Sequence, residues 1–340
     1  MLASSSSKNS TTVRARSKTS LRLAKVALQT AFGVSEELGT TLAEKLFTSP
    51  RRYSRPARER AFLTTARPLS IEVTLRSPRW HHAKRTIAAW RWGFGPAVLL
   101  VHGWEGRGTQ LGAFVEPFVE AGLSVIAFDA PGHGNSPERQ LYLTDLADCV
   151  ADVAAAAGPL HAIIAHSFGA AAVLLAHARA GVDVQRTVFV APNAILDDSI
   201  QQFAHTLGLD EADRMLLEHR LVAQTGVPFS SLAIDQLTAG RDSALLVFHD
   251  DSDREVPLKQ GERLVAAWPN AQFVVTHDLG HRRILRDRDV IAAAVAFVTE
   301  GISAPTSDLK TGSLRYAARR SAGLPSPPAA STTSAPSCAT

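Results

Sequence analysis

The stretch IIAHSFGAAAV, Ile163–Val173, joins a short apolar run to an alanine-rich segment through a single serine. The run has the length and β-branched content of a buried strand, and the alanines after it favour a helix. A strand–turn–helix unit of this kind presents a nucleophilic serine in the G-x-S-x-G pattern, although Ala165 replaces the first glycine here. A serine that only caps a helix occupies the same position. Ser167 is therefore either a nucleophile or a helix cap.

Similar apolar runs recur on both sides of this stretch, and most are followed by a helical pattern. The expected strands are residues 71–75, 86–92, 98–101, 124–129, 161–166, 187–191, 245–250 and 272–276. The first two alternate between apolar and polar residues, which predicts an antiparallel start. The later alternation of strands and helices predicts an α/β fold, with a mostly parallel central sheet and helices on both faces.

Three segments fall outside this alternation. Residues 1–60 hold a basic low-complexity leader, a helical pattern from Leu21 to Phe47 and a linker, whereas residues 303–340 are rich in Ser, Pro and Ala and are expected to be disordered. The main domain is expected at 61–302. Within it, residues 192–242 carry only helical patterns, which predicts a small helical lid over the carboxyl ends of the strands. Phe203, Leu207, Met215 and Leu216 of this lid are expected either to line the pocket or to form the lid's own core.

Charge and cysteine content narrow the class of protein. Six basic residues and no acidic one lie between Met1 and Ser35, so this start carries more than the whole net charge of +4 and no nucleic-acid partner is expected. Its composition is similar to a transit peptide, but a disordered extension is the simpler interpretation. Cys149 and Cys338 form no disulfide framework, which favours a reducing compartment and a cytoplasmic location. Polar residues interrupt Ala162–Ala178, so no membrane span is predicted.

Polar residues follow the ends of three expected strands in the order Ser, Asp, His. Ser167 follows one strand, Asp250, Asp251 and Asp253 end or follow another, and His281 follows the last. Catalytic groups collect at the carboxyl ends of the strands in open α/β sheets. A serine hydroxyl needs a neighbouring imidazole to take its proton, and the imidazole needs a carboxylate to orient it. Otherwise His281 is an ordinary exposed loop histidine.

The chain resembles the α/β-hydrolase superfamily, in its branch of esterase-like and lipase-like enzymes with a serine nucleophile. The resemblance covers about residues 69–300 and rests on five ordered motifs, HGWEG, DAPGHGNS, AHSFG, HDDSDREVP and a late GH. It implies an α/β-hydrolase fold in which Ser167 is the nucleophile and His281 the general base. Family spacing makes Asp253 the acid, four residues after His249, with Asp251 as the alternative.

The resemblance also implies a function. The backbone N–H groups of Phe168 and Trp104 would form the oxyanion hole, and the reaction would cleave a small carboxylic ester or thioester through an acyl-enzyme. Amidase, C–C hydrolase and acyltransferase activity remain alternatives, as does a non-catalytic ligand-binding protein. No phosphate-binding glycine motif and no metal-ligand spacing occurs, so no cofactor and no metal are expected. The acyl group and the oligomeric state stay open.

Overall fold

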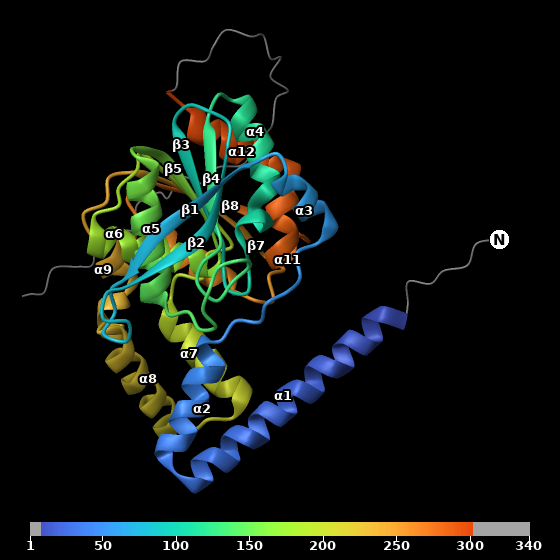
Figure 1. Cartoon of the computed structure of the whole chain (residues 1–340), viewed down its shortest axis with the longest axis vertical. Helices are drawn as coiled ribbons and strands as arrows, with labels where there is room; N and C mark the ends of the chain where they lie inside the picture. Colours follow the sequence, from blue (N-terminus) through green and yellow to red (C-terminus); the bar gives the residue numbers. More distant parts are fainter. Residues whose placement is uncertain (1–7, 302–340) are drawn as a thin grey trace, which may run out of the picture.

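A single twisted sheet of eight strands runs through the molecule (Figure 1). The computed structural model describes residues 8–301. The strand order is β1-β2-β4-β3-β5-β6-β7-β8, in which β2 runs antiparallel to its neighbours β1 and β4, and the six strands β3 to β8 are parallel to one another. The strands are β1 (Arg67–Leu75), β2 (Ala83–Trp92), β3 (Ala97–Val101), β4 (Ser124–Phe128), β5 (Leu160–His166), β6 (Arg186–Val190), β7 (Ala244–Asp250) and β8 (Ala271–Thr276). All eight predicted strands and the antiparallel start are confirmed.

The continuous apolar runs of the central strands supply two hydrophobic cores. Successive side chains of a strand point to opposite faces of the sheet. In β3, Leu99 and Val101 therefore enter one core, while Val98 and Leu100 enter the other, and all four are fully buried. This two-sided burial explains why β3 shows no alternation in sequence.

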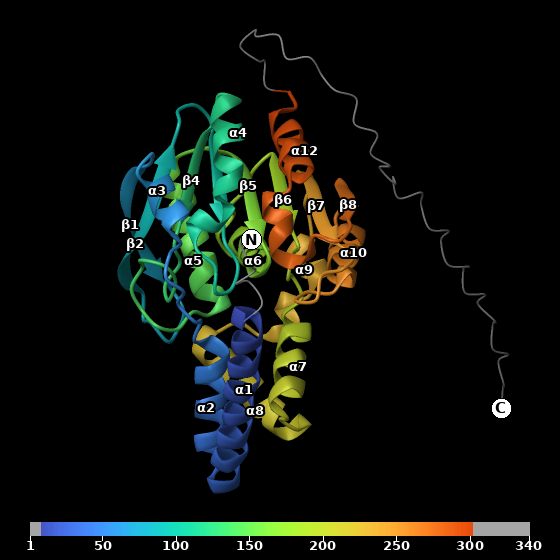
Figure 2. The same cartoon turned by 90° about the vertical axis from the view of Figure 1, so that its right-hand side faces the viewer.

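Helices cover both faces of the sheet (Figure 2). The helices on one face are α5 (Leu143–Ala157), α6 (Phe168–Ala180), α9 (Ile234–Thr238) and α10 (Leu258–Ala266). The helices on the other face are α3 (Ala57–Leu63), the 3₁₀ turns η1 (Gly108–Phe114) and η3 (Ile284–Arg286), α4 (Val115–Glu120) and α12 (Arg288–Thr299). The short α11 (Gly280–Arg283) follows β8 at the carboxyl edge.

Four helices form a cap at the carboxyl edge of the sheet. They are α1 (Lys8–Val34), α2 (Glu36–Thr48), α7 (Leu196–Leu207) and α8 (Glu211–Thr225), and the short η2 (Phe229–Leu232) follows them. Their shared core contains Leu28 from α1, Ala43 from α2, Ile200 from α7 and Leu217 from α8, all fully buried. The cap therefore joins the first described residues of the chain to the 192–242 insert.

The sequence-based expectation for the start of the chain differs from the structure in two respects. The lid was expected from residues 192–242 alone, whereas α1 and α2 supply half of the cap. Helix α1 begins at Lys8, inside the expected low-complexity leader, and Ser35 separates it from α2. The Ser35 side chain accepts a hydrogen bond from the N–H of Leu38, which starts the second helix there. Residues 303–340 lie outside the described residues.

Candidate active site

The AHSFG stretch forms a tight turn between β5 and α6. Ser167 has φ 53° and ψ −124°, a backbone conformation that is strained for a residue with a side chain. Although Ser167 occupies the N-cap position, its hydroxyl makes no capping hydrogen bond and points to His281 instead. A Cβ atom on Gly169 would lie 2.8 Å from the carbonyl oxygens of Val101 and His102, so this position tolerates no side chain. Ala165, in place of the other glycine, is fully buried in β5.

Three of the predicted side chains form one hydrogen-bonded chain. Nε2 of His281 lies 3.0 Å from Oγ of Ser167, and Nδ1 of His281 lies 2.7 Å from Oδ2 of Asp253. Nδ1–H donates to the carboxylate, so Nε2 is left to accept the serine proton. Ser167 and His281 are each 7% exposed, and the Asp253 side chain is fully buried. The three residues come from the ends of β5, β8 and β7, which are brought together at the carboxyl edge of the sheet.

The Asp253 carboxylate is held in its ionised form. Burial by itself raises its pKa, but the nearby His249 ring and the hydrogen bonds from His281 and from the N–H of Val256 outweigh burial and hold the pKa well below its usual range. Oδ1 accepts from the N–H groups of Glu255 and Val256, at 2.8 and 3.0 Å. Oδ2 is thereby left to face His281. A charge fixed in this way can orient an imidazole and stabilise its protonated form.

The other two aspartates of the acid loop have different partners. Asp251 is exposed and lies 2.5 Å from Nδ1 of His277, so the structure places it away from His281. Asp250 is fully buried and accepts hydrogen bonds from the hydroxyls of Ser252 and Thr276 and from the N–H of Leu279. Burial raises the pKa of Asp250, but these bonds dominate and lower it to about 2. Asp250 ends β7 as the sequence predicts. Its hydrogen bond with Leu279, which connects β7 to the loop that carries His281, was not predicted.

Two further histidines support the site and were not predicted to do so. His166, next to Ser167, donates from Nε2 to the carbonyl oxygen of His281 at 3.0 Å. His249 donates from Nε2 to the carbonyl of Val256 at 3.1 Å and lies 3.6 Å from Asp253. Burial lowers the pKa of His166 to about 3, so its ring is neutral at pH 7. Only the position of His166 inside the AHSFG motif could have signalled its role.

The two predicted oxyanion positions flank Ser167. Within residues 8–301, neither the N–H of Phe168 nor that of Trp104 donates a hydrogen bond to the protein. The two side chains meet edge to face, with ring centroids 5.9 Å apart. A Cβ atom on Gly103 would lie 2.8 Å from Cβ of Ser167, so this glycine lets the loop after β3 approach the serine. Two free donors beside a hydroxyl can bind a developing negative charge.

Comparisons with known proteins agree with this architecture. The model of a family described as "Serine aminopeptidase, S33" matches residues 95–216. Rv0554 from Mycobacterium tuberculosis is 18% identical, with a TM-score of 0.54 over 68% of this chain and 99% of its own. A thermophilic esterase from Thermogutta terrifontis is 17% identical, with a TM-score of 0.51 over 68% and 98%. Est1E from Butyrivibrio proteoclasticus, with ferulic acid bound, is 18% identical, with a TM-score of 0.53 over 64% and 96%. No curated protein matches the chain.

The chain has the α/β-hydrolase fold. The solved structures align with about two thirds of the chain, and the motifs that predicted this fold lie at the carboxyl ends of its strands. The predicted α/β-hydrolase fold is thereby confirmed, whereas sequence identities below 20% leave the chemistry of the site to be argued from its own residues.

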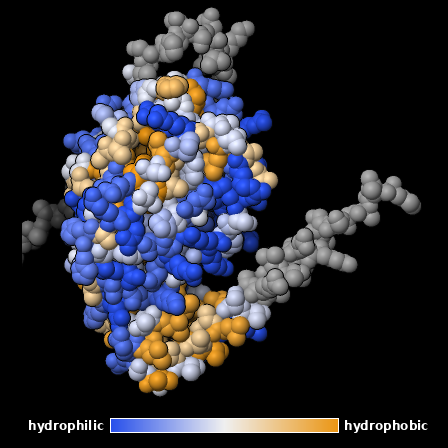
Figure 3. Space-filling model, viewed as in Figure 1, coloured by the Kyte–Doolittle hydropathy of each residue, from blue (hydrophilic) through white to orange (hydrophobic). Residues whose placement is uncertain are grey.

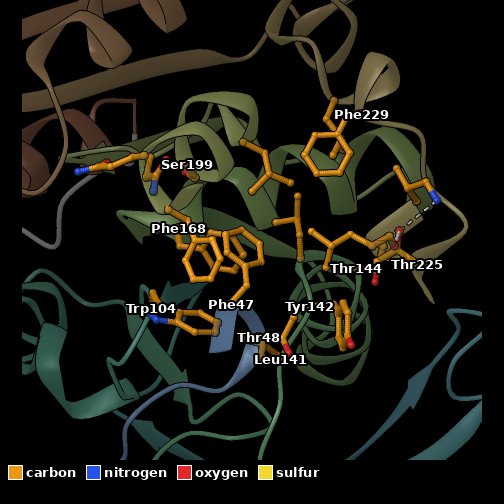
Figure 4. Close-up of a pocket in the computed structure, with 18 of the residues that line it drawn as sticks. Phe47, Thr48, Trp104, Leu141, Tyr142, Thr144, Phe168, Ser199, Thr225 and Phe229 are labelled. Carbon is orange, nitrogen blue, oxygen red and sulfur yellow. Dashed lines mark hydrogen bonds between the residues drawn. The ribbon is translucent and has the colours of Figure 1, made fainter. Parts of the chain in front are cut away.

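A cavity of about 540 Å³ lies between the α/β-hydrolase sheet and the cap (Figure 4). Trp104 and Phe168 line it beside the serine turn, and Phe47 of α2 and Phe203 of α7 meet there with ring centroids 5.0 Å apart. Fourteen lining residues are apolar or aromatic: Leu46, Phe47, Trp104, Leu141, Tyr142, Leu143, Phe168, Leu175, Leu196, Phe203, Leu221, Val227, Phe229 and Leu232. This volume and lining suit a small molecule with a large apolar part.

The charge inside the cavity is low. Arg51 is the one charged lining residue, and its guanidinium pairs with Glu105 at 2.8 Å.

Of the four lid residues expected in the pocket or in the lid's own core, Phe203 lines the cavity. Leu207 is instead buried in the core of the cap, and Met215 is 45% exposed. Leu216 is likewise not among the lining residues. The sequence did not signal this difference because all four residues share the helical periodicity of a packed lid.

Residues 8–301 lack two kinds of feature. They contain no group of three or more His, Cys, Asp or Glu side chains placed to hold a metal ion. No helix in the described part is long and apolar enough to cross a membrane.

Proposed function

We propose that the protein is a serine hydrolase that cleaves a carboxylic ester or thioester through an acyl-enzyme on Ser167. The observation that carries this proposal is the hydrogen-bonded chain from Ser167 through His281 to Asp253, beside two free backbone N–H groups. One of the similar structures is an esterase, and its activity class agrees with the proposal.

The reaction follows from these positions. Oγ of Ser167 attacks the carbonyl carbon while Nε2 of His281 takes its proton, and Asp253 stabilises the resulting imidazolium. The N–H groups of Phe168 and Trp104 hold the oxyanion of the tetrahedral intermediate. His281 then gives the proton to the leaving alcohol or thiol. A water molecule, deprotonated by His281, releases the acid and restores the serine.

The cavity favours an ester over a peptide substrate. An aminopeptidase substrate carries a positively charged amino group, which needs a carboxylate partner when it is buried. The lining residues of the cavity include no Asp or Glu. An apolar acyl or alcohol group, by contrast, is stabilised by this lining at about 25 cal/mol per Å² of buried apolar surface.

Replacement of the serine tests the proposal directly. Ser167→Ala is expected to lower the turnover of p-nitrophenyl esters roughly 10⁴-fold or more and to abolish covalent labelling by a fluorophosphonate probe. The exposed Ser230→Ala is the matched control and should keep both. Full turnover by Ser167→Ala would refute the proposal. A chain-length series of p-nitrophenyl esters and CoA thioesters then defines the acyl group.

A further inference from the structure

The exposed apolar side chains of the described residues are concentrated on α1 and α2. Ten large apolar side chains are exposed in this part of the chain, and six of them lie within residues 21–46. Four of these define one surface, which we call the outer face of the α1–α2 hairpin: Leu23 (66% exposed), Val26 (60%), Val34 (71%) and Leu38 (48%). Figure 3 shows this end of the molecule coloured as hydrophobic.

The outer face is additional to the surface that α1 uses for folding. Leu28 and Ala31 of α1 are buried in the cap. Leu23, Val26 and Val34 recur at spacings of three and eight residues, which places them along one side of the helix, away from Leu28. A helix that is apolar on a second, exposed side normally has a partner for that side.

The charge of the hairpin indicates the nature of this partner. Residues 8–38 contain six basic and two acidic residues. One of the two acids, Glu37, is already paired with Arg220 of α8 at 2.6 Å. Arg22 and Lys25 are exposed on α1, Arg22 beside the outer face and Lys25 next to Gly208 of the cap, and neither has an ion-pair partner among the described residues. A second copy of the chain would bring the same excess of positive charge against this surface, whereas an anionic partner would neutralise it.

We propose that the outer face of the α1–α2 hairpin docks on the surface of an anionic lipid bilayer. A helix that carries exposed Leu and Val beside Arg and Lys binds in the interface, with its apolar side among the acyl chains and its basic side chains on the headgroups. This association needs no spanning helix, and none is present in the described residues.

Helix α2 connects the outer face to the cavity. Leu38, Leu42 and Leu46 follow one another at four-residue spacing, so they lie along one side of α2. Leu46 is 36% exposed and also lines the cavity. An acyl ester taken from the bilayer would have a continuous apolar path to the site. This consequence rests on the proposed function, whereas the docking itself does not.

Vesicle sedimentation tests the docking without any turnover. The full chain is expected to sediment with vesicles of phosphatidylcholine and phosphatidylserine, to bind pure phosphatidylcholine vesicles at least about tenfold more weakly, and to dissociate at high salt. The double variant Leu23→Ser/Val26→Ser should lose about tenfold or more in binding. Arg22→Glu/Lys25→Glu should lose a similar factor on the anionic vesicles.

Two matched controls and one competing outcome complete the test. Phe94→Ser removes an apolar side chain that is 91% exposed in the turn between β2 and β3, and Lys259→Glu reverses an exposed charge on α10. Both should bind vesicles like the parent chain.

Absence of binding to anionic vesicles, or equal binding by the Leu23→Ser/Val26→Ser variant, overturns the proposal. So does a dimer in sedimentation velocity that this variant abolishes, since the partner would then be a second copy. Ser167→Ala should bind vesicles normally, so a failed docking test and a failed hydrolase test remain distinct.

Discussion

Asp253 and Asp250 are three residues apart. Asp253 holds the imidazole ring of His281, whereas Asp250 holds the loop that carries His281. Asp253 contacts the imidazole at 2.7 Å, and Asp250 accepts the N–H of Leu279, two residues before it. Asp251, between them, faces His277. The geometry therefore assigns orientation of the ring to Asp253 and position of the loop to Asp250.

Substitution of the acid separates these assignments. Asp253→Asn is expected to lower kcat about 10³–10⁴-fold, because the amide no longer fixes the tautomer that leaves Nε2 free. Asp251→Asn is the control and should stay within about twofold, since an exposed ion pair contributes little. Steady-state kinetics on a p-nitrophenyl ester decides between them. A large loss in Asp251→Asn with little loss in Asp253→Asn would reverse the assignment.

Asp250→Asn addresses the position of the loop. Its amide nitrogen would face the hydroxyl and N–H donors that the carboxylate now satisfies, at a cost of about 1–3 kcal/mol in the free energy of unfolding. We expect kcat to fall about tenfold with little change in KM, because the ring moves away from Ser167 while the cavity is unchanged. Chemical denaturation and kinetics measure the two effects. Unchanged kcat in a destabilised variant would leave Asp250 with a purely structural role.

At the scale of elements, the contact between α2 and α7 sets the size of the cavity. Phe203→Ala removes one ring of the Phe47–Phe203 pair and is expected to shift the preferred p-nitrophenyl ester to a longer acyl chain. Leu207→Ala is the matched control, because Leu207 lies one turn further along α7 but is buried in the core of the cap. It should lower the melting temperature without changing the preferred chain. The same preference in both variants would mean that α7 does not bind the acyl group.

The elements of the sheet were predictable from sequence, and the cap was not. Each central strand is a continuous apolar run bounded by polar residues, so local pattern alone locates it. The contacts of α1 with α7 and of α2 with α8 join residues more than 160 positions apart, and a helical pattern does not say which helix it packs against. Likewise, the motifs locate Ser167 and His281. The tie from Asp250 to Leu279 depends on the register of β7 against β8, which the sequence does not display.

At the scale of the whole molecule, three buried histidines make stability depend on pH. His102 and His133 each accept a backbone N–H at Nε2, from Ala130 and Glu105, and donate from Nδ1 to a carbonyl. Protonation would therefore place a donor against a donor. Burial lowers the pKa of His102 to about 4 and that of His133 to about 3, as it does for His166.

The sign of the effect follows from proton uptake. Below the usual imidazole pKa of 6.5 the unfolded chain binds protons that the folded chain excludes until about pH 4, so stability falls as the pH is lowered through this window. Asp145 opposes this trend, because burial raises its pKa to about 6 and the folded state gains a proton there. Asp253 and Asp250, with lowered pKa values, add a further loss of stability only below about pH 4.

The three histidines lower the free energy of unfolding as the pH falls, and Asp145 raises it, by about 1.4 kcal/mol per pKa unit for each group. Since the histidines outnumber the aspartate, the free energy of unfolding decreases by several kcal/mol in total between about pH 6.5 and 4. Urea unfolding across this range should show the free energy of unfolding decreasing steadily. His133→Gln is expected to be less stable at pH 7 and to reduce the slope between about pH 6 and 4 by about half, because the net difference of two protons (three excluded by histidines, one gained by Asp145) falls to one. His219→Gln, at an exposed position on α8, should leave the slope unchanged. A free energy that stays flat down to about pH 4 would mean that these rings accept protons in the folded state.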